Sequence, residues 1–370
     1  MNKLRFLIPI CMSAVLLLAN AQVRADEDKH AEYARKLAEI MAYYEEEGLF
    51  QGTVLVAMDD EVLLRDGYGY ADLRWGIRNE PETRIPIASL GKALTAAMVL
   101  QLAEEGRISL DDPLSEHLTT FRRDVGERIT IDQMLGHTAG LPWPADDWPE
   151  EAFTRYYALD ELVRQIEQVE LKFEPGEQYS YCNSCYNLLA AMIEEVTGNE
   201  FETELKTRIL KPAGMVNTGI VYRQPVIERL AAGYELVDGV LTNALPQDQS
   251  YAVGAGGLYS TVDDLYRWDR ALYGGTLLEP ESIELMFESG LGGAGYGWAI
   301  GAYVEVGTED VRKLALGYGG TYGYASGIAR LLPDRYFIVF LGNVRHVPQN
   351  RLMNDLWNTI LGLDVDPREE

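Results

Sequence analysis

The chain reads Ile85-Pro-Ile-Ala-Ser-Leu-Gly-Lys92 directly before an apolar run over residues 93–105 that has a helical pattern. Ser89 and Lys92 are three residues apart, so a helical turn would place both side chains on one face. A serine hydroxyl is a poor nucleophile unless a neighbouring group takes its proton, and a lysine at this spacing can lie within reach of it. The stretch therefore predicts a serine that forms a covalent acyl-enzyme.

The start of a helix is also a favourable place for this serine. If Ser89 opens the helix, its backbone N–H has no intrahelical partner, and the positive end of the helix dipole favours a developing negative charge. Ser89 would then supply both the nucleophile and half of an oxyanion hole. The S-x-x-K pattern arises by chance about once in a chain of this length, so the interpretation depends on further segments.

A second segment carries a phenol and an amide. Tyr181-Cys-Asn183 precedes a helical run over residues 185–196, which Gly198 would end. On extended backbone, Tyr181 and Asn183 point the same way and would share one wall of a cleft. The alternatives are a core aromatic for Tyr181 and a helix N-cap for Asn183.

A third segment is rich in glycine and lies near the end of the chain. Gly317-Tyr-Gly-Gly-Thr321 precedes two strand candidates, residues 324–332 and 335–343. Glycines in such a segment allow a ligand to approach the strand backbone closely, so that a main-chain N–H can be aimed at it.

In this order, S-x-x-K, Y-x-N and an aromatic-Gly-Gly triplet resemble the serine β-lactamase and penicillin-binding-protein superfamily. The chain is most similar to the group that holds class C β-lactamases, D-Ala-D-Ala peptidases and family VIII carboxylesterases. The similarity runs from about Gln51 to Asn343 and includes HTAGLP at 137–142, KPAGM at 211–215 and AGGLYSTVDDL at 255–265. It implies an α/β (α+β) fold of the β-lactamase/transpeptidase-like type, an antiparallel sheet flanked by helices with an inserted, mainly helical lobe.

The secondary-structure pattern agrees with that fold. Strands are expected at both ends of the chain around a helical middle from residue 93 to about 209. The expected helices are 30–47 and 350–361, and the expected strands are 52–58, 61–66, 296–306, 324–332 and 335–343.

The resemblance also implies a mechanism. Ser89 attacks the acyl carbon, while Lys92 and Tyr181 share the transfer of its proton. Both side chains have unperturbed pKa values of about 10, so the site must lower at least one of them. The other site residues are implied to bind substrate or to form the oxyanion hole, which the N–H of Thr321 completes: Asn183, Tyr318, Gly319, Gly320 and Thr321.

Tyr318 stands where many relatives carry a lysine that holds a substrate carboxylate. This departure favours a neutral carboxylic ester or amide as the substrate, although Lys313, Arg330 or Arg345 could supply a charge from another direction. The alternatives are a β-lactamase or a D-Ala or D-amino-acid peptidase acting on peptidoglycan-type substrates, and an acyl transferase. A non-catalytic homologue that binds peptidoglycan or a protein partner is a different class.

The N-terminus indicates export. Residues 1–25 contain Lys3 and Arg5, an apolar run from Phe6 to Ala19, and small residues at Ala21 and Ala25 that suit cleavage. We expect a signal peptide over 1–25, one hydrolase domain over 26–370, and a periplasmic or secreted protein without stable membrane insertion after cleavage. The net charge of −26 argues against nucleic acid as a partner, and a small-molecule ester, amide or peptide is the expected one.

The remaining reactive side chains imply no metal and no cofactor. The four histidines stand at positions 30, 117, 137 and 346, and none is paired at metal-ligand spacing. His137 is expected to hold a loop rather than to act in catalysis. Cys182 and Cys185 form either two packed thiols or a local disulfide beside Tyr181.

Overall fold

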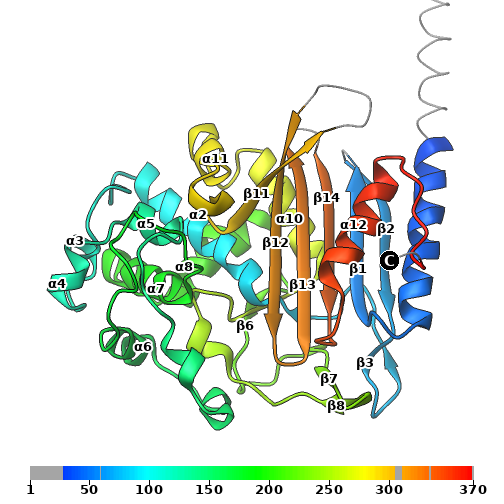
Figure 1. Cartoon of the computed structure of the whole chain (residues 1–370), viewed down its shortest axis with the longest axis horizontal. Coiled ribbons are helices and arrows are strands. Elements are labelled where there is room, and N and C mark those ends of the chain that lie inside the picture. The colour runs from blue at the N-terminus through cyan, green and yellow to red at the C-terminus, as the bar shows by residue number, and fades with distance from the viewer. Residues whose placement is uncertain (1–27, 59, 305–310, 333–334, 369–370) are drawn as a thin grey trace, which may run out of the picture.

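A seven-stranded antiparallel sheet forms the centre of the molecule (Figure 1). The computed structural model describes residues 28–58, 60–304, 311–332 and 335–368. The strand order is β10-β11-β12-β13-β14-β1-β2, so the first strands of the chain pair with the last, and Gly52 lies opposite Gly342. The strands are β1 (Gly52–Met58), β2 (Glu61–Tyr68), β10 (Ala294–Gly295), β11 (Trp298–Val304), β12 (Val311–Thr321), β13 (Tyr324–Leu332) and β14 (Tyr336–Gly342).

Helices cover both faces of the sheet. Side chains along a strand point alternately to the two faces, and β1, β13 and β14 bury the side chains of both faces. One face packs against α12 (Gln349–Ile360) and the helix over residues 28–46. The other packs against α2 (Gly91–Glu104), α10 (Val262–Tyr273) and α11 (Pro280–Met286). The sheet thus separates two hydrophobic cores.

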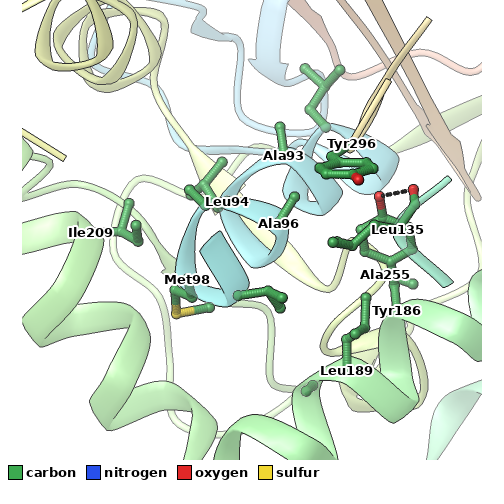
Figure 2. Close-up of a cluster of buried hydrophobic side chains, with 14 of the residues drawn as sticks. Ala93, Leu94, Ala96, Met98, Leu135, Tyr186, Leu189, Ile209, Ala255 and Tyr296 are labelled. Carbon is green, nitrogen blue, oxygen red and sulfur yellow. Dashed lines mark hydrogen bonds between the residues drawn. The ribbon is translucent and has the colours of Figure 1, made fainter. Parts of the chain in front are cut away.

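The helical lobe lies beside the second of these faces and is inserted between β5 (Ile85–Pro86) and β9 (Leu258–Ser260). Besides α2, its main elements are α5 (Ile131–Leu135), α6 (Leu159–Ile166), α7 (Asn183–Thr197) and the π-helical turn η4 (Leu205–Leu210). Helix α2 is buried on almost all sides within it. Ala96 and Met98 of α2 belong to one core with Leu189 of α7, and the Tyr186 hydroxyl donates to the Leu135 carbonyl at 2.9 Å (Figure 2).

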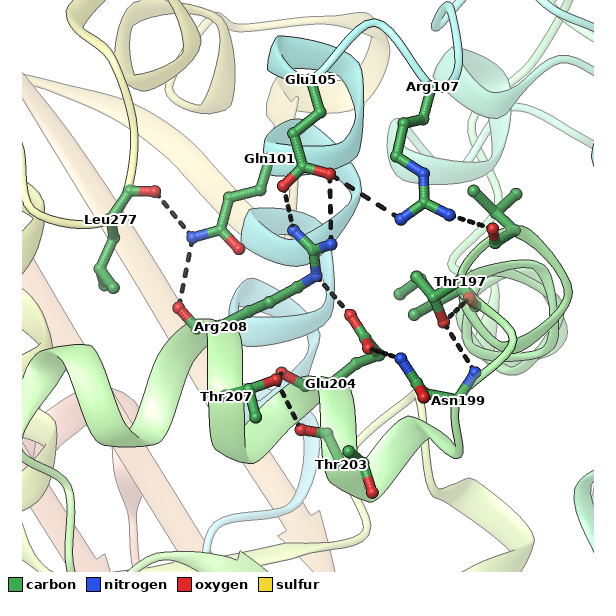
Figure 3. A network of polar contacts seen from close by, with 12 residues as sticks. Gln101, Glu105, Arg107, Thr197, Asn199, Thr203, Glu204, Thr207, Arg208 and Leu277 are labelled. Atoms are coloured by element: carbon green, nitrogen blue, oxygen red, sulfur yellow. Dashed lines mark hydrogen bonds and ion pairs between the residues drawn. The ribbon is translucent and has the colours of Figure 1, made fainter.

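A polar network fixes the end of α2 against the lobe (Figure 3). The Arg208 guanidinium bonds to Glu105 at 2.5 Å and to Glu204, and the Gln101 amide donates to the Leu277 carbonyl at 2.8 Å. The network therefore holds the helix that begins next to Ser89.

Three small sheets complete the architecture, and one of them is the pairing of β3 (Tyr70–Asp72) with β4 (Ile77–Arg78). β5 pairs with β9, which also pairs with β6 (Gly219–Ile220), and this three-stranded sheet carries the chain into the Ser89 turn. β7 (Tyr234–Val237) and β8 (Val240–Asn243) form a hairpin. The remaining short elements are α3 (Leu114–His117), α4 (Arg123–Gly126), η2 (Pro144–Asp147), η3 (Glu150–Thr154), α8 (Phe201–Glu204), α9 (Lys211–Ala213), η5 (Gln249–Ala252) and η6 (Leu291–Gly293).

The predicted fold class is confirmed, and most predicted elements are found within a few residues of their expected bounds. Strand β12 was not predicted. The glycine-rich segment over residues 317–321 was expected to precede the strands, but it forms the last part of β12. The predicted signal peptide over residues 1–25 lies outside the described residues. No helix in the described ranges is long and apolar enough to cross a bilayer.

Candidate active site

Ser89 lies in a single 3-10 turn, η1 (Ala88–Leu90), between β5 and α2. The α-helix itself begins at Gly91, so Ser89 precedes the helix by two residues rather than opening it. Ala88 has a φ of 46°, a conformation that is costly for a residue with a Cβ and is often found at functional sites. Gly256 makes this turn possible, since a Cβ there would lie 2.5 Å from the Ala88 carbonyl carbon. The fold therefore holds the serine in a constrained turn.

Lys92 reaches Ser89 from the first turn of α2. Its Nζ lies 3.3 Å from the Ser89 Oγ, 2.8 Å from the Asn183 Oδ1 and 2.6 Å from the Ala255 carbonyl oxygen. The side chain is 2% exposed, and no carboxylate among the described residues pairs with it. Burial without a counter-charge holds the pKa of Lys92 well below its usual value. A neutral amine can donate to Asn183 and Ala255 and keep its lone pair for the Ser89 proton.

Tyr181 lies over the same amine. Its ring centroid is 4.7 Å from the Lys92 Nζ, and its ring stacks on His137 at 4.8 Å. Desolvation of the phenol raises its pKa to about 12, although 47% of the residue surface is exposed. A hydrogen bond with Ser89 acts in the opposite direction and lowers the pKa. Of the two candidate bases, Lys92 has the lowered pKa and Tyr181 stays protonated at neutral pH.

His137 holds the loop that carries Tyr181, as the sequence predicts. Its Nδ1 accepts the Cys182 N–H at 2.9 Å, and its carbonyl accepts the Ser180 N–H at 3.0 Å. Burial lowers the pKa of His137 to about 3, and the nearby Lys92 acts in the same direction, so the ring stays neutral. Cys182 and Cys185 form a disulfide with a Cα–Cα distance of 5.4 Å, which selects one of the two predicted alternatives.

Asn183 is the first residue of α7 rather than its N-cap. Cys182 occupies the N-cap position, and its Sγ accepts the Cys185 N–H. The Asn183 amide oxygen is therefore free to bond to the Lys92 amine, and Asn183 lines the same cavity as Ser89.

Strand β12 forms the opposite wall of this cavity, which has a volume of about 370 Å³. A Cβ on Gly319 would lie 2.4 Å from the Ile87 carbonyl oxygen and 3.2 Å from the Ala88 Cβ, so only glycine allows the strand to approach the Ser89 turn. Gly320 and Thr321 line the cavity, and the Thr321 hydroxyl donates to the Gln247 side chain at 2.6 Å.

Tyr318 is not brought together with these residues. Gly317 and Gly319 face the Ser89 side of the sheet, so the alternation of the strand turns Tyr318 to the other face. There it packs, like Leu314 and Leu316, against the core under α12. The expectation that Tyr318 binds substrate is therefore corrected: position 318 contributes no side chain to the cavity.

The cavity also contains residues that the motifs do not mark. Phe153 lies 5.0 Å from Tyr251 and 5.8 Å from Tyr322, measured between ring centroids, and Trp143 lines the same space. Tyr322 and Trp143 lie near motif segments, which was their only signal in the sequence. Three charged side chains also line it: Asp146, Glu235 and Arg345.

One surface group resembles a metal site in composition. Ligand atoms of Asp112, Glu116 and His117 lie within 4.8 Å of one another. The His117 ring and the Asp112 carboxylate bond to each other at 2.7 Å, and Asp112 also accepts the Ser109 N–H. These bonds account for the cluster without an ion.

Replacing Gly319 with alanine should destabilise the protein, because the new Cβ would contact backbone at 2.4 Å. We expect the free energy of unfolding to fall by about 1–3 kcal/mol and turnover to fall with it. The matched control is Gly301→Ala in β11, where the nearest atom to the added Cβ is 3.9 Å away. Chemical denaturation of both variants tests the prediction, and equal stability would contradict it.

The chain belongs to the beta-lactamase family, whose model matches residues 31–359. It is 34% identical over 279 residues to the putative penicillin-binding protein PbpX of Bacillus subtilis (strain 168), an alignment that covers 75% of this chain and 68% of PbpX. It is 32% identical to protein flp of Staphylococcus aureus (strain N315), but the alignment covers only 58% of this chain and 44% of flp.

Solved structures show the same fold. The octameric penicillin-binding protein homologue from Pyrococcus abyssi is similar with a TM-score of 0.77 at 26% identity, covering 90% of this chain and 78% of that one. The D-amino acid amidase from Ochrobactrum anthropi SV3 is similar in fold, with a TM-score of 0.77 at 20% identity, covering 89% and 99%. The fold is thus that of the serine hydrolases of the beta-lactamase family.

Proposed function

We propose that this protein is a serine hydrolase that forms an acyl-enzyme on Ser89 and cleaves a carboxylic ester or amide. The observation that carries the proposal is the buried Lys92 amine, which has no carboxylate partner in the described part of the chain and lies 3.3 Å from the Ser89 Oγ. A binding protein would gain nothing from a desolvated amine at this place, whereas a general base needs one.

In the first half-reaction the neutral Lys92 amine accepts the Ser89 proton as the Oγ bonds to the acyl carbon. The two N–H groups of Lys92 remain on Asn183 and Ala255, which fix the direction of its lone pair. The negative charge that develops on the carbonyl oxygen is held by the backbone N–H groups of Ser89 and Thr321, which form the oxyanion hole.

The leaving group then needs a proton, and Tyr181 is the nearest acid. Its phenol is protonated at neutral pH because its pKa is raised to about 12. It donates to the departing alkoxide or amine and is reprotonated by the Lys92 ammonium over which it lies. In the second half-reaction water attacks the acyl carbon, its proton passes to Lys92, and Ser89 recovers a proton as the acid leaves.

The aromatic side chains of the cavity suit an apolar or aromatic acyl group. Export belongs to the same proposal: residues 1–25 are a signal peptide, and residues 26–370 are a single hydrolase domain that acts beyond the cytoplasm. N-terminal sequencing of the mature protein tests this part.

The test of the activity is a comparison of three substrate classes with the purified protein: p-nitrophenyl butyrate, an amino-acid p-nitroanilide and a penicillin. Turnover of the ester or the anilide supports the proposal. A penicillin adduct that persists without turnover of the other two would replace it with a penicillin-binding peptidase, and no reaction with any of them would favour a binding protein.

Replacing Tyr181 with phenylalanine should lower kcat by about 10²- to 10⁴-fold, because the leaving group loses its acid. The loss should be smaller for p-nitrophenyl esters, whose leaving group departs without a proton, than for amides. Tyr179→Phe is the matched control, since Tyr179 also contacts the His137 ring, at 5.9 Å. Steady-state kinetics on both substrates test the prediction, and an equal loss on ester and amide would contradict the assigned acid.

A further inference from the structure

The disulfide between Cys182 and Cys185 lies inside the active-site segment, although the proposed mechanism makes no use of it. Cys182 stands between Tyr181 and Asn183, and both cysteines are buried, at 1% and 0% exposure. The bridge joins residues only three positions apart. A bridge that closes so short a loop constrains the unfolded chain much less than one that closes a long loop. We therefore looked for its effect in the folded site.

The backbone around Tyr181 is held by hydrogen bonds to a neighbouring loop. Tyr181 precedes α7, which begins at Asn183. The Ser180 N–H donates to the His137 carbonyl at 3.0 Å, and the Cys182 N–H donates to the His137 Nδ1 at 2.9 Å. These two bonds tie Tyr181 to the His137 loop, but they do not tie it to α7.

The disulfide makes the connection to the helix. Cys182 is the N-cap residue of α7, and its Sγ accepts the Cys185 N–H at 3.0 Å in addition to forming the covalent bond. Cys185 belongs to the hydrophobic core together with Tyr186 and Leu189 of the same helix. The residue that directly follows Tyr181 is thus bonded covalently to a buried helix.

The side chain of Tyr181 needs such support because its own packing is limited. It is half-exposed, and its ring contacts the His137 ring at 4.8 Å and the Lys92 Nζ at 4.7 Å. The position of its hydroxyl therefore depends on the backbone that carries it. A displacement of about 1 Å in a reacting group can cost about a hundredfold in rate.

We propose that the Cys182–Cys185 disulfide is a positioning element of the reaction: it ties the residue after Tyr181 to α7 and so keeps the Tyr181 hydroxyl where it can protonate the leaving group. The inference rests on the proposed function. Asn183 is part of α7 and is held by the helix itself, so the bridge acts on the acid, Tyr181, rather than on the base, Lys92.

The test is the double variant Cys182→Ser/Cys185→Ala, which removes the covalent bond but keeps a side-chain oxygen at the N-cap. For an amino-acid p-nitroanilide, kcat should fall about tenfold with KM unchanged. For p-nitrophenyl butyrate, whose leaving group needs no proton, kcat should stay within about twofold. In a Tyr181→Phe background the same double substitution should cause no further loss on the anilide. Equal losses on the two substrates, or a full loss in the Tyr181→Phe background, would overturn the proposal.

Ser184→Ala is the matched control, because it loosens the same turn of α7 without touching the bridge. The Ser184 side chain is buried, and its Oγ donates to the Pro142 carbonyl at 2.5 Å. Ser184→Ala should leave the ratio of anilide kcat to ester kcat within about twofold of its original value. A fall in this ratio as large as that of the double variant would show a general effect of the turn and overturn the proposal.

Two measurements separate this inference from the proposed function, because neither requires turnover. Alkylation of the denatured, unreduced protein should leave Cys182 and Cys185 unlabelled, and labelling of both would overturn the inference. The second measurement is ¹⁹F NMR with 3-fluorotyrosine in place of Tyr181. A single narrow resonance that broadens or splits in the double variant supports the positioning role even if the protein hydrolyses neither substrate, and an unchanged spectrum overturns it.

Discussion

Ser89→Ala should reduce ester and amide turnover by at least about a thousandfold while the protein remains folded. In the proposed mechanism Ser89 supplies the only atom that bonds to the acyl group. Its side chain contacts Lys92 and Tyr181 and does not pack in the hydrophobic core, so its truncation should leave the fold intact. The measurement is steady-state kinetics together with thermal unfolding of the same preparation.

Ser115→Ala provides the matched control for this prediction. Ser115 lies in α3 of the lobe, is half-buried like Ser89 and lines no part of the Ser89 cavity. It should keep full activity. Turnover that persists in Ser89→Ala at more than a few per cent, after contaminating esterase is excluded, would mean that another group is the nucleophile.

Lys92 should control the acidic limb of the pH profile of kcat/KM. Because burial lowers its pKa, the amine is neutral above that lowered value and becomes protonated as the pH falls through it. Activity is therefore present above the Lys92 pKa and lost below it. No basic limb is expected until the pH approaches the Tyr181 pKa of about 12.

Substitution of Lys92 tests the same assignment. Lys92→Met keeps the length and burial of the side chain but removes the base, so we expect a loss of about 10²- to 10⁴-fold and the disappearance of the acidic limb from any residual activity. A profile whose activity rises toward low pH, or an active Lys92→Met variant with an unchanged limb, would contradict Lys92 as the base.

The sequence predicts much of this site because its chemistry is encoded locally. Ser89 and Lys92 are one turn apart on consecutive helical elements, and Tyr181 and Asn183 flank the start of α7. The Lys92 contact with the Ala255 carbonyl joins segments 163 residues apart, so no local pattern could reveal it.

The errors of the sequence analysis have two causes, low strand propensity in one segment and contacts between segments far apart in the chain. Strand β12 was missed because its glycines lower strand propensity, and without the strand the alternation that turns Tyr318 away could not be applied. Phe153 in η3 and Tyr251 in η5 are far apart in the sequence and meet only in the folded protein. Arg345 was one of three equivalent cations until the fold placed it on Gly320.

The most direct test of the central claim is intact-mass spectrometry after exposure to a fluorophosphonate, followed by peptide mapping. The account predicts one covalent adduct on the peptide that contains Ser89, and no adduct on Ser89→Ala. An adduct on another residue, or none on a folded protein that still turns over esters, would contradict the assignment of Ser89 as the nucleophile.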